Sequence, residues 1–315
     1  MEKSIKMIIA LIIFLLAGVG ITVMVSNNRN NTEKITIIAT NFPAYDFARA
    51  VAGETAEIKM LINPGVEMHD FEPTPGDIID IKNSELFIYT GGESDEWIED
   101  ILGDINANKT RLFRMMDAVK IVEEEAIEGM EDAEESGETE YDEHIWTSLR
   151  NAEKIVDRIK DELIEISPEN KSVFEENAKN YTEKLAELDS EFQEIVANGK
   201  RDVIVFGDRF PFRYFVDDYG LDYFAAFPGC SEQTEASNKT IAFLVDKIKT
   251  EKIPVVFKVE MSSGKIAETI ANETGAEILT FNSAHNISAE DFKSGLTYAK
   301  IMKNNTEVLQ KALEQ

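Results

Sequence analysis

SPENKSVFEENAKNYTEKLAELDSEFQEIVANG, residues 167–199, decides the architecture of this chain. Ser167 can cap a helix, Pro168 suits its first turn, and Glu169 would lie at the positive end of the helix dipole. Apolar residues then recur at every third or fourth position: Phe174, Ala178, Tyr181, Leu185, Leu188, Phe192 and Ile195. Asn198-Gly199 supplies the stop. A helix of about thirty residues is roughly 45 Å long, more than one small domain covers, so we expect it to join two lobes.

Strand-like segments rich in β-branched and aromatic residues alternate with helical segments on both sides of this helix. They are residues 35–39, 57–62 and 85–89 before it, and 203–206, 223–227, 255–259 and 277–281 after it. This alternation predicts an α/β fold of two lobes, each a parallel sheet covered by helices, joined by one long backbone helix. The predicted boundaries are 34–166 for the N-terminal lobe, 167–199 for the connecting helix and 200–315 for the C-terminal lobe.

Residues 1–33 are predicted to form a signal anchor and a linker. Lys3 and Lys6 precede an uncharged apolar stretch from Met7 to Val25, which as a helix would be roughly 28 Å long, close to one bilayer core. Lysines ahead of such a stretch favour keeping that end in the cytoplasm, so the rest of the chain is expected to be exported. Val19 stands where a lipoprotein signal would place its cysteine, which excludes lipid anchoring by that route. We expect an uncleaved anchor at the outer face of the cytoplasmic membrane, with a cleaved signal as the alternative.

The charge of the chain excludes one class of partner. With 60 acidic and 32 basic residues the net charge is -28, and such a surface repels nucleic acid. Twelve of the acids, and no Lys or Arg, lie in residues 123–143. We expect this segment to be a mobile, solvated loop that at most concentrates cations weakly. The single cysteine, Cys230, cannot form an intramolecular disulfide, and a packing role at a turn is favoured for it over a metal-ligand role.

Three histidines follow strand-like or turn segments, and open α/β sheets bind their ligands where the strands end. His69 lies in Glu67-Met-His69-Asp-Phe-Glu72-Pro-Thr-Pro75, just past the second predicted strand. His144 closes the acidic segment, and His285 follows the last predicted strand. A neutral imidazole with an accessible ring nitrogen binds a borderline metal such as zinc. For any one of these histidines alone, a surface or structural role would be the commoner one.

Two of these motifs resemble the signatures of a known family. Residues 67–77 and the run Asp142-Glu-His144-Ile-Trp146 are similar to the first and second metal-binding signatures of the cluster A-I zinc and manganese solute-binding proteins. The long helix, the run from Tyr214 to Leu221 and the strand end Lys258-Val-Glu260 match as well, so the resemblance extends from Ile35 to about Ala312. It implies that His69 and His144 are the metal ligands given by the N-terminal lobe.

The C-terminal lobe departs from the pattern of that family. Arg209 stands at about the place of the usual third ligand, a histidine, and Asn282 at about the place of the usual acidic fourth ligand. An arginine stays protonated and cannot ligate a cation, and an amide oxygen is a poor zinc donor. His285 is the first candidate in their place, because zinc favours imidazole. Glu260 and Asp208 are the next candidates, although either acid could instead hold neighbouring groups, and a water could complete the shell.

The resemblance implies a monomeric, extracytoplasmic solute-binding subunit that captures zinc in an interlobe cleft and delivers it to an ABC permease with its ATPase. Three imidazoles favour Zn²⁺ over Mn²⁺, but if only His69 and His144 bind, together with acids, manganese or iron becomes equally plausible. A metal-binding adhesion or sensing protein with the same fold is a further alternative. An enzyme is not expected, and a metallohydrolase is disfavoured because the chain has no His-Glu-x-x-His helix, paired-metal acid motif or nucleophile elbow.

Overall fold

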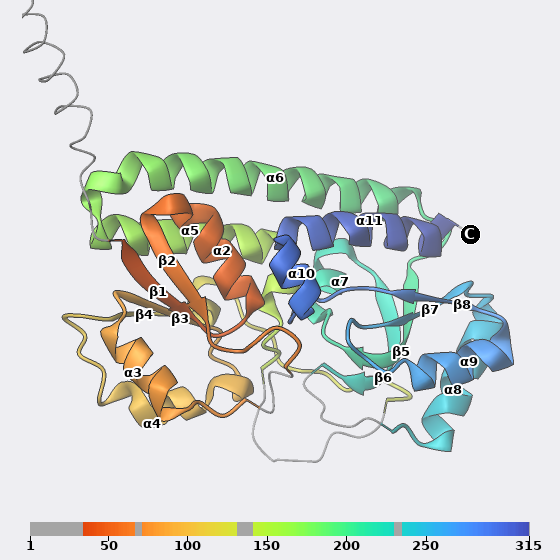
Figure 1. Ribbon diagram of the computed structural model, residues 1–315. Coiled ribbons are helices and arrows are strands. Elements are labelled where there is room, and N and C mark those ends of the chain that lie inside the picture. Colours follow the sequence, from red (N-terminus) through yellow and green to blue (C-terminus); the bar gives the residue numbers. More distant parts are fainter. Residues whose placement is uncertain (1–33, 67–70, 131–140, 230–234, 315) are drawn as a thin grey trace, which may run out of the picture. The chain divides into compact units, whose positions relative to one another are not determined.

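A computed structural model describes residues 34–66, 71–130, 141–229 and 235–314 of the chain. These residues contain two four-stranded sheets, one in each lobe (Figure 1). The first sheet comprises β1 (Ile35–Ala39), β2 (Ala56–Met60), β3 (Leu86–Tyr89) and β4 (Arg111–Arg114), in the order β2-β1-β3-β4. The second comprises β5 (Val203–Phe210), β6 (Asp222–Pro228), β7 (Val255–Lys258) and β8 (Glu277–Thr280), in the order β6-β5-β7-β8. All neighbouring strands in both sheets pair in parallel, which confirms the predicted fold class.

Helices lie around both sheets (Figure 1). Those of the first lobe include α2 (Phe42–Ala52), α3 (Pro75–Asn83) and α4 (Trp97–Leu102), and those of the second include α7 (Arg213–Tyr219), α8 (Asn238–Glu251) and α9 (Lys265–Thr274). The short helix α10 (Ala289–Ser294) packs against α2 through Phe292 and Tyr45. Short 3-10 turns occupy Gly53–Thr55, Glu93–Asp95, Met115–Ala118, Ile145–Thr147 and Pro168–Asn170. Strands enclosed on both faces need continuous apolar runs, and β1 meets this need because Ile37, Ile38 and Ala39 are all buried. Asn41 is the N-cap of α2, and its side chain accepts a hydrogen bond from the backbone N–H of Ala44 at 3.1 Å.

The predicted connecting helix is present as α6 (Lys171–Asn198), preceded by the 3-10 turn at Pro168–Asn170. Six of the seven residues of the predicted stripe are buried; they are Phe174, Ala178, Leu185, Leu188, Phe192 and Ile195. The seventh, Tyr181, is half-buried and donates its hydroxyl hydrogen to Asp46 at 3.0 Å. The prediction that Ser167 caps the long helix was wrong. Ser167 ends the preceding helix, α5 (Leu149–Ile166), which was not predicted from the sequence.

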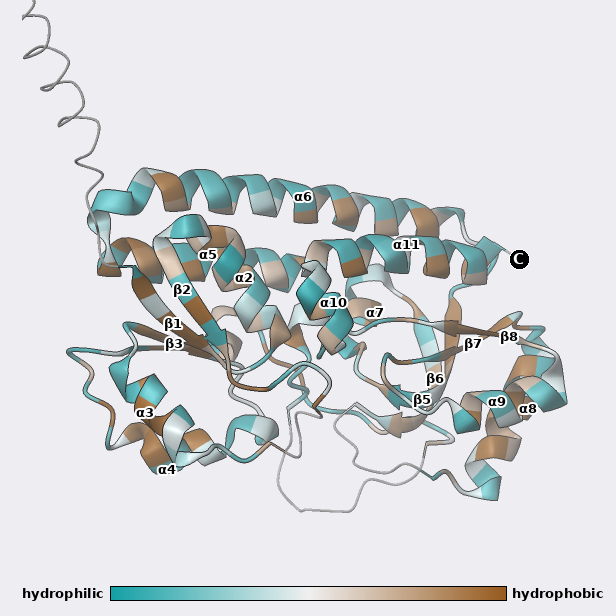
Figure 2. Cartoon of the chain, in the orientation of Figure 1, coloured by the Kyte–Doolittle hydropathy of each residue, from teal (hydrophilic) through white to brown (hydrophobic). Residues whose placement is uncertain are grey.

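The helix α6 lies along both lobes (Figure 1), packed against α5 in the first half of the molecule and against α11 (Tyr298–Glu314) in the second. The apolar residues of these three helices turn toward the sheets, and their polar residues turn outward (Figure 2). One hydrophobic core runs beneath them without interruption. It contains Ile37 from the first sheet, Phe192 from α6 and Phe206 from the second sheet. Because the two lobes share this core, a wide hinge movement between them would expose apolar surface.

The acidic segment is more ordered at its two ends than we predicted. Glu123 and Tyr141 form an antiparallel bridge, and the backbone N–H of Asp142 donates to the carbonyl of Val122 at 3.0 Å. After the bridge the chain crosses to the second lobe, where Glu125 pairs with Arg213 at 3.2 Å and Met130 is only 8% exposed. The prediction of a structureless loop over 123–143 was therefore wrong for these ends, because apolar residues and a counter-ion hold them. Residues 131–140 and Cys230 lie outside the described residues.

Among the helices of the described residues, none is both long and apolar enough to cross a membrane. The predicted signal anchor, Met7 to Val25, lies outside these residues.

Candidate metal centre

His144 occupies a position prepared for a metal ligand. It directly precedes the 3-10 turn at Ile145–Thr147, and its side chain is completely buried. The carboxylate of Asp142 accepts hydrogen bonds from the backbone N–H of His144 at 2.8 Å and from its ring Nδ1 at 3.1 Å. This arrangement places the hydrogen on Nδ1 and leaves the lone pair on Nε2. Among the described residues, nothing forms a hydrogen bond with that Nε2.

The acids around His144 control its protonation. Burial lowers the pKa of this imidazole, but the carboxylates of Asp142, Glu143 and Glu124 act in the opposite direction and together raise the pKa above its ordinary value. The negative charge that favours an imidazolium also favours a bound cation. A metal ion and a proton therefore compete for the same nitrogen.

His285 approaches His144 from the other lobe. It lies in the loop after β8, where its backbone N–H donates to the Oε1 of Glu260 at 3.1 Å. The two imidazole rings are 5.1 Å apart between centroids and nearly perpendicular, at 86°. Trp146 packs against both rings, at 5.6 Å from His144 and 5.5 Å from His285. The structure thus brings two of the three predicted histidines together, although 140 positions separate them in the sequence.

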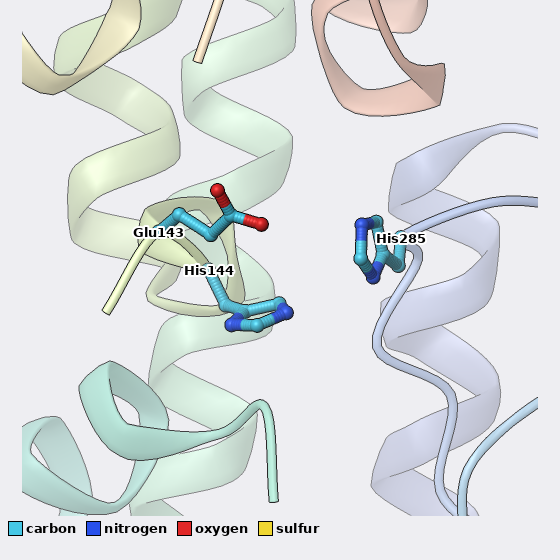
Figure 3. A group of neighbouring side chains, drawn as sticks. All are labelled: Glu143, His144 and His285. Atoms are coloured by element: carbon cyan, nitrogen blue, oxygen red, sulfur yellow. The ribbon is translucent and has the colours of Figure 1, made fainter. Parts of the chain in front are cut away.

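A third side chain, that of Glu143, joins this pair, although it was not among the predicted ligands. One carboxylate oxygen of Glu143 and one ring nitrogen from each of His144 and His285 all lie within 4.8 Å of one another. Figure 3 shows Glu143 and His144 on one segment, with His285 facing them across the gap. Two imidazoles and a carboxylate are a usual set of zinc ligands. The only feature of the sequence that could have indicated Glu143 as a ligand is its position next to His144 in the second signature.

Glu260 and Asp208, the other predicted ligands, have carboxylates that bind the backbone. Glu260 accepts hydrogen bonds from the N–H and hydroxyl of Ser283, at 2.7 and 2.6 Å, and from the N–H of His285. Burial raises the pKa of Glu260, although these hydrogen bonds act to lower it. Asp208 accepts from the N–H groups of Arg209 and Val259, at 2.9 and 3.3 Å. Both acids therefore hold the loops around the histidines.

The remaining residues named from the sequence divide into three cases. Arg209 lines the same small pocket as His144, His285 and Glu260. Asn282 has a structural place, because its side-chain oxygen accepts from the N–H of Ala284 at 2.8 Å. His69 lies outside the described residues, so its ligand role stays a prediction.

The pocket between the lobes suits a very small ligand. Its volume is about 40 Å³, room for an ion with a few waters rather than for an organic molecule. Gly229 forms part of its wall, and a Cβ at that position would lie 3.3 Å from the ring of His144. Val66 and Met261, which are 40% and 55% exposed, lie at its edge. A buried polar interior and an exposed apolar edge are consistent with a site for a desolvated cation.

Comparison with known proteins gives the family. A family model described as the periplasmic component A of the zinc-uptake complex, ZnuA, matches residues 37–312. The chain belongs to this family. The resemblance seen in the two histidine motifs is thereby confirmed, and this family consists of metal-binding transport components.

Individual relatives agree with this assignment. The chain is similar to the zinc-binding lipoprotein AdcA of Streptococcus pneumoniae strain R6, with 31% identity over 92% of this chain and 58% of the relative. It is also similar to the high-affinity zinc uptake system protein ZnuA of Bacillus subtilis strain 168, with 29% identity over 97% of this chain and 96% of the relative. The chain therefore spans little more than half the length of AdcA but nearly all of the Bacillus protein.

The fold of this chain also matches a solved structure from the family. The Zn(II)-bound ZnuA-like domain of Streptococcus pneumoniae AdcA superposes with a TM-score of 0.75 and 29% identity. The match covers 90% of this chain and 100% of that domain.

Proposed function

We propose that this chain captures zinc outside the cytoplasm and delivers it to the membrane permease of an ABC importer. The observation that carries the proposal is the buried Nε2 of His144, which has no hydrogen-bond partner in the described part of the chain and lies across the gap from His285. A buried polar atom without a partner costs about 1–3 kcal/mol, and a bound cation would remove that cost. The zinc-related names of the relatives support zinc as the cation.

Capture requires only a small movement in this geometry. The three candidate ligand atoms lie within 4.8 Å of one another, whereas ligands 2.0–2.1 Å from a tetrahedral zinc ion are about 3.3 Å apart. Zinc would draw the atoms together by at most about 1.5 Å. Loops can move this far while the shared core beneath α6 stays intact. Because the ligands come from both lobes, occupancy favours their closer approach, and the permease would recognise that closed form.

The proposed ligands are His144 and His285, with His69 as a further one. Val66 lines the pocket, and His69 follows it by only three positions in the sequence. Glu260 and Asp208 are less favoured because, among the described residues, neither groups with His144 and His285 within 4.8 Å. Nitrogen ligands favour zinc over manganese, which prefers oxygen.

The location and partners of the protein follow from the same proposal. The lobe boundaries at 34–166 and 200–315, the export of the chain, and its attachment through a signal anchor in residues 1–33 remain part of it. The partner would be a permease with its ATPase, and the protein would act as a monomer that catalyses no reaction.

Competition titration against a chromophoric zinc chelator, on protein freed of metal, tests the proposal. We expect one zinc ion per chain, and affinity at least about 100-fold lower in His144→Ala and in His285→Ala, since each loses a first ligand. Asn177→Ala is the matched control, because its side chain also donates to a backbone carbonyl, that of Val51, but does not line the pocket. Wild-type protein without measurable zinc affinity would overturn the proposal. If the protein binds Mn²⁺ more tightly than Zn²⁺, the cargo is manganese and not zinc.

A further inference from the structure

The geometry points to Glu143 as a metal ligand that the N-terminal lobe supplies alongside His144, in place of a ligand that the C-terminal lobe lacks. This inference rests on the proposed function and adds a residue to its site. One oxygen of the Glu143 carboxylate lies within 4.8 Å of a ring nitrogen of both His144 and His285. The unpartnered Nε2 of the buried His144 is independent evidence that this space receives a ligand.

The carboxylate of Glu143 is fixed in place before any metal arrives. The residue is completely buried, and burying a carboxylate is costly unless hydrogen bonds compensate it. Ser94, in the loop after β3, donates to it twice, from the backbone N–H at 3.2 Å and from the hydroxyl at 2.5 Å. Zinc ligands are commonly held in this way by neighbouring donors, which fix the direction of the remaining lone pairs.

The same loop leaves room for the carboxylate by means of a glycine. A Cβ on Gly92 would lie 2.3 Å from the Oε2 of Glu143, closer than any side chain allows. Gly92 does not have a left-handed backbone, since its φ is -89°. Its lack of a side chain is therefore explained by the approach of Glu143 and not by a turn conformation.

Among the described residues, Glu143 is the acid that groups with both imidazoles within 4.8 Å, and neither Glu260 nor Asp208 does so. The carboxylates of these two acids instead accept hydrogen bonds from the loops of the C-terminal lobe. Arg209 also lines the pocket and is a cation. A carboxylate from the first lobe offsets this positive charge and supplies the oxygen ligand that an arginine cannot.

Two substitutions that each remove one negative charge test the inference. Glu143→Gln keeps the size of the side chain, and its amide oxygen can still accept from Ser94, but an amide oxygen is a poor zinc ligand. Glu123→Gln removes the same charge from an exposed residue of the same segment. We expect zinc affinity to fall at least about tenfold in Glu143→Gln and to stay within about twofold of wild type in Glu123→Gln. The visible spectrum of bound Co²⁺ should change in the first variant only, because it reports the ligands themselves.

Equal zinc affinity and equal Co²⁺ spectra in wild type and Glu143→Gln would overturn the inference, while loss of binding in His144→Ala would leave the proposed function standing. If Glu143→Gln does not fold, Ser94→Ala provides the second measurement, since it removes the hydroxyl donor and leaves the carboxylate held by the backbone N–H alone. An unchanged affinity in that variant would also count against the inference. Absence of zinc binding in the wild-type chain would overturn the proposed function itself.

Discussion

The indole Nε1 of Trp146 donates a hydrogen bond to the backbone oxygen of Ser283 at 2.9 Å. This bond joins the two segments that carry His144 and His285, which come from different lobes. The backbone oxygen of Trp146 in turn accepts from the hydroxyl of Tyr298, at the start of α11. The tryptophan of the second signature therefore fixes the relative position of the two segments that carry the histidines.

Replacing Trp146 by phenylalanine should weaken both the fold and metal capture. The substitution keeps an aromatic ring but leaves the buried oxygen of Ser283 without its donor, at a cost of about 1–3 kcal/mol in the free energy of unfolding. Zinc affinity should fall on the order of tenfold, because the support of both histidines is loosened. Urea unfolding and zinc titration measure the two effects. Trp97→Phe is the control, since among the described residues its Nε1 has no hydrogen-bond partner to lose; equal zinc affinities in the two variants would contradict the prediction.

As the pH is lowered, zinc affinity should begin to fall at a higher pH than it would for a histidine with an ordinary pKa. The neighbouring carboxylates raise the pKa of His144 above the usual 6.5, and the protonated ring cannot bind metal. A raised pKa means that more of the ring is protonated at any given pH, so the decline starts above pH 6.5. In Asp142→Asn the decline should move toward lower pH, because one raising charge is lost. At pH 8 the affinity of that variant should still be about 10–100-fold weaker, since the ring is no longer oriented by a carboxylate. Zinc titrations from pH 5 to 8 give the pH at which half of the affinity change has occurred. If this pH is the same in Asp142→Asn as in wild type, Asp142 does not raise the pKa of His144.

Adding one methyl group beside Glu143 should disturb the centre without changing any ligand. In Gly92→Ala the new Cβ would collide with the carboxylate at 2.3 Å, so the carboxylate must move. We expect zinc affinity to fall about tenfold. Gly103→Ala is the matched control, because a Cβ there meets nothing within 4 Å. Calorimetric zinc titration of both variants provides the comparison, and a normal affinity in Gly92→Ala would show that the position of Glu143 does not matter.

Two glutamates on α5 should differ in their value to stability. Glu162 has a side chain only 5% exposed and binds Arg111 at 2.6 Å and Arg158 at 2.7 Å. Glu165 binds the same Arg111 at 2.7 Å but is 62% exposed. We expect Glu162→Gln to lower the free energy of unfolding by about 1–2 kcal/mol, because two charged hydrogen bonds to a buried carboxylate are lost while both arginines remain solvated. Glu165→Gln should change it by less than about 1 kcal/mol. Similar urea midpoints in the two variants would refute this difference.

The spacing of apolar residues predicted the fold, because residues on the buried side of a helix or strand recur at the period of that element. The stripe from Phe174 to Ile195 predicted α6, and the β-branched runs predicted both parallel sheets. The helix α5 was not predicted, although it has a stripe of the same kind, with Leu149, Ile159 and Leu163 buried, so its sequence carries the same periodic signal as that of α6.

The ligand set was harder to predict, for a physical reason. A carboxylate at a strand end can bind an ion or backbone N–H groups equally well, and only the surroundings decide between them. Glu260 and Asp208 found backbone donors. Glu143 lies near both imidazoles because Ser94 and Gly92, about fifty positions earlier, hold and admit its side chain. No local pattern records a contact between segments so distant in the sequence.

The uninterrupted core beneath α6 also limits how this molecule can be taken apart. A chain severed between α6 and β5 would leave Phe192 and Phe206, now packed in one interior, bare on separate fragments. Neither piece would be expected to stay soluble alone, and grafting one half onto a foreign partner would leave mismatched apolar faces. Changes of metal preference are therefore accessible through the few side chains in the gap, and not through exchange of whole halves.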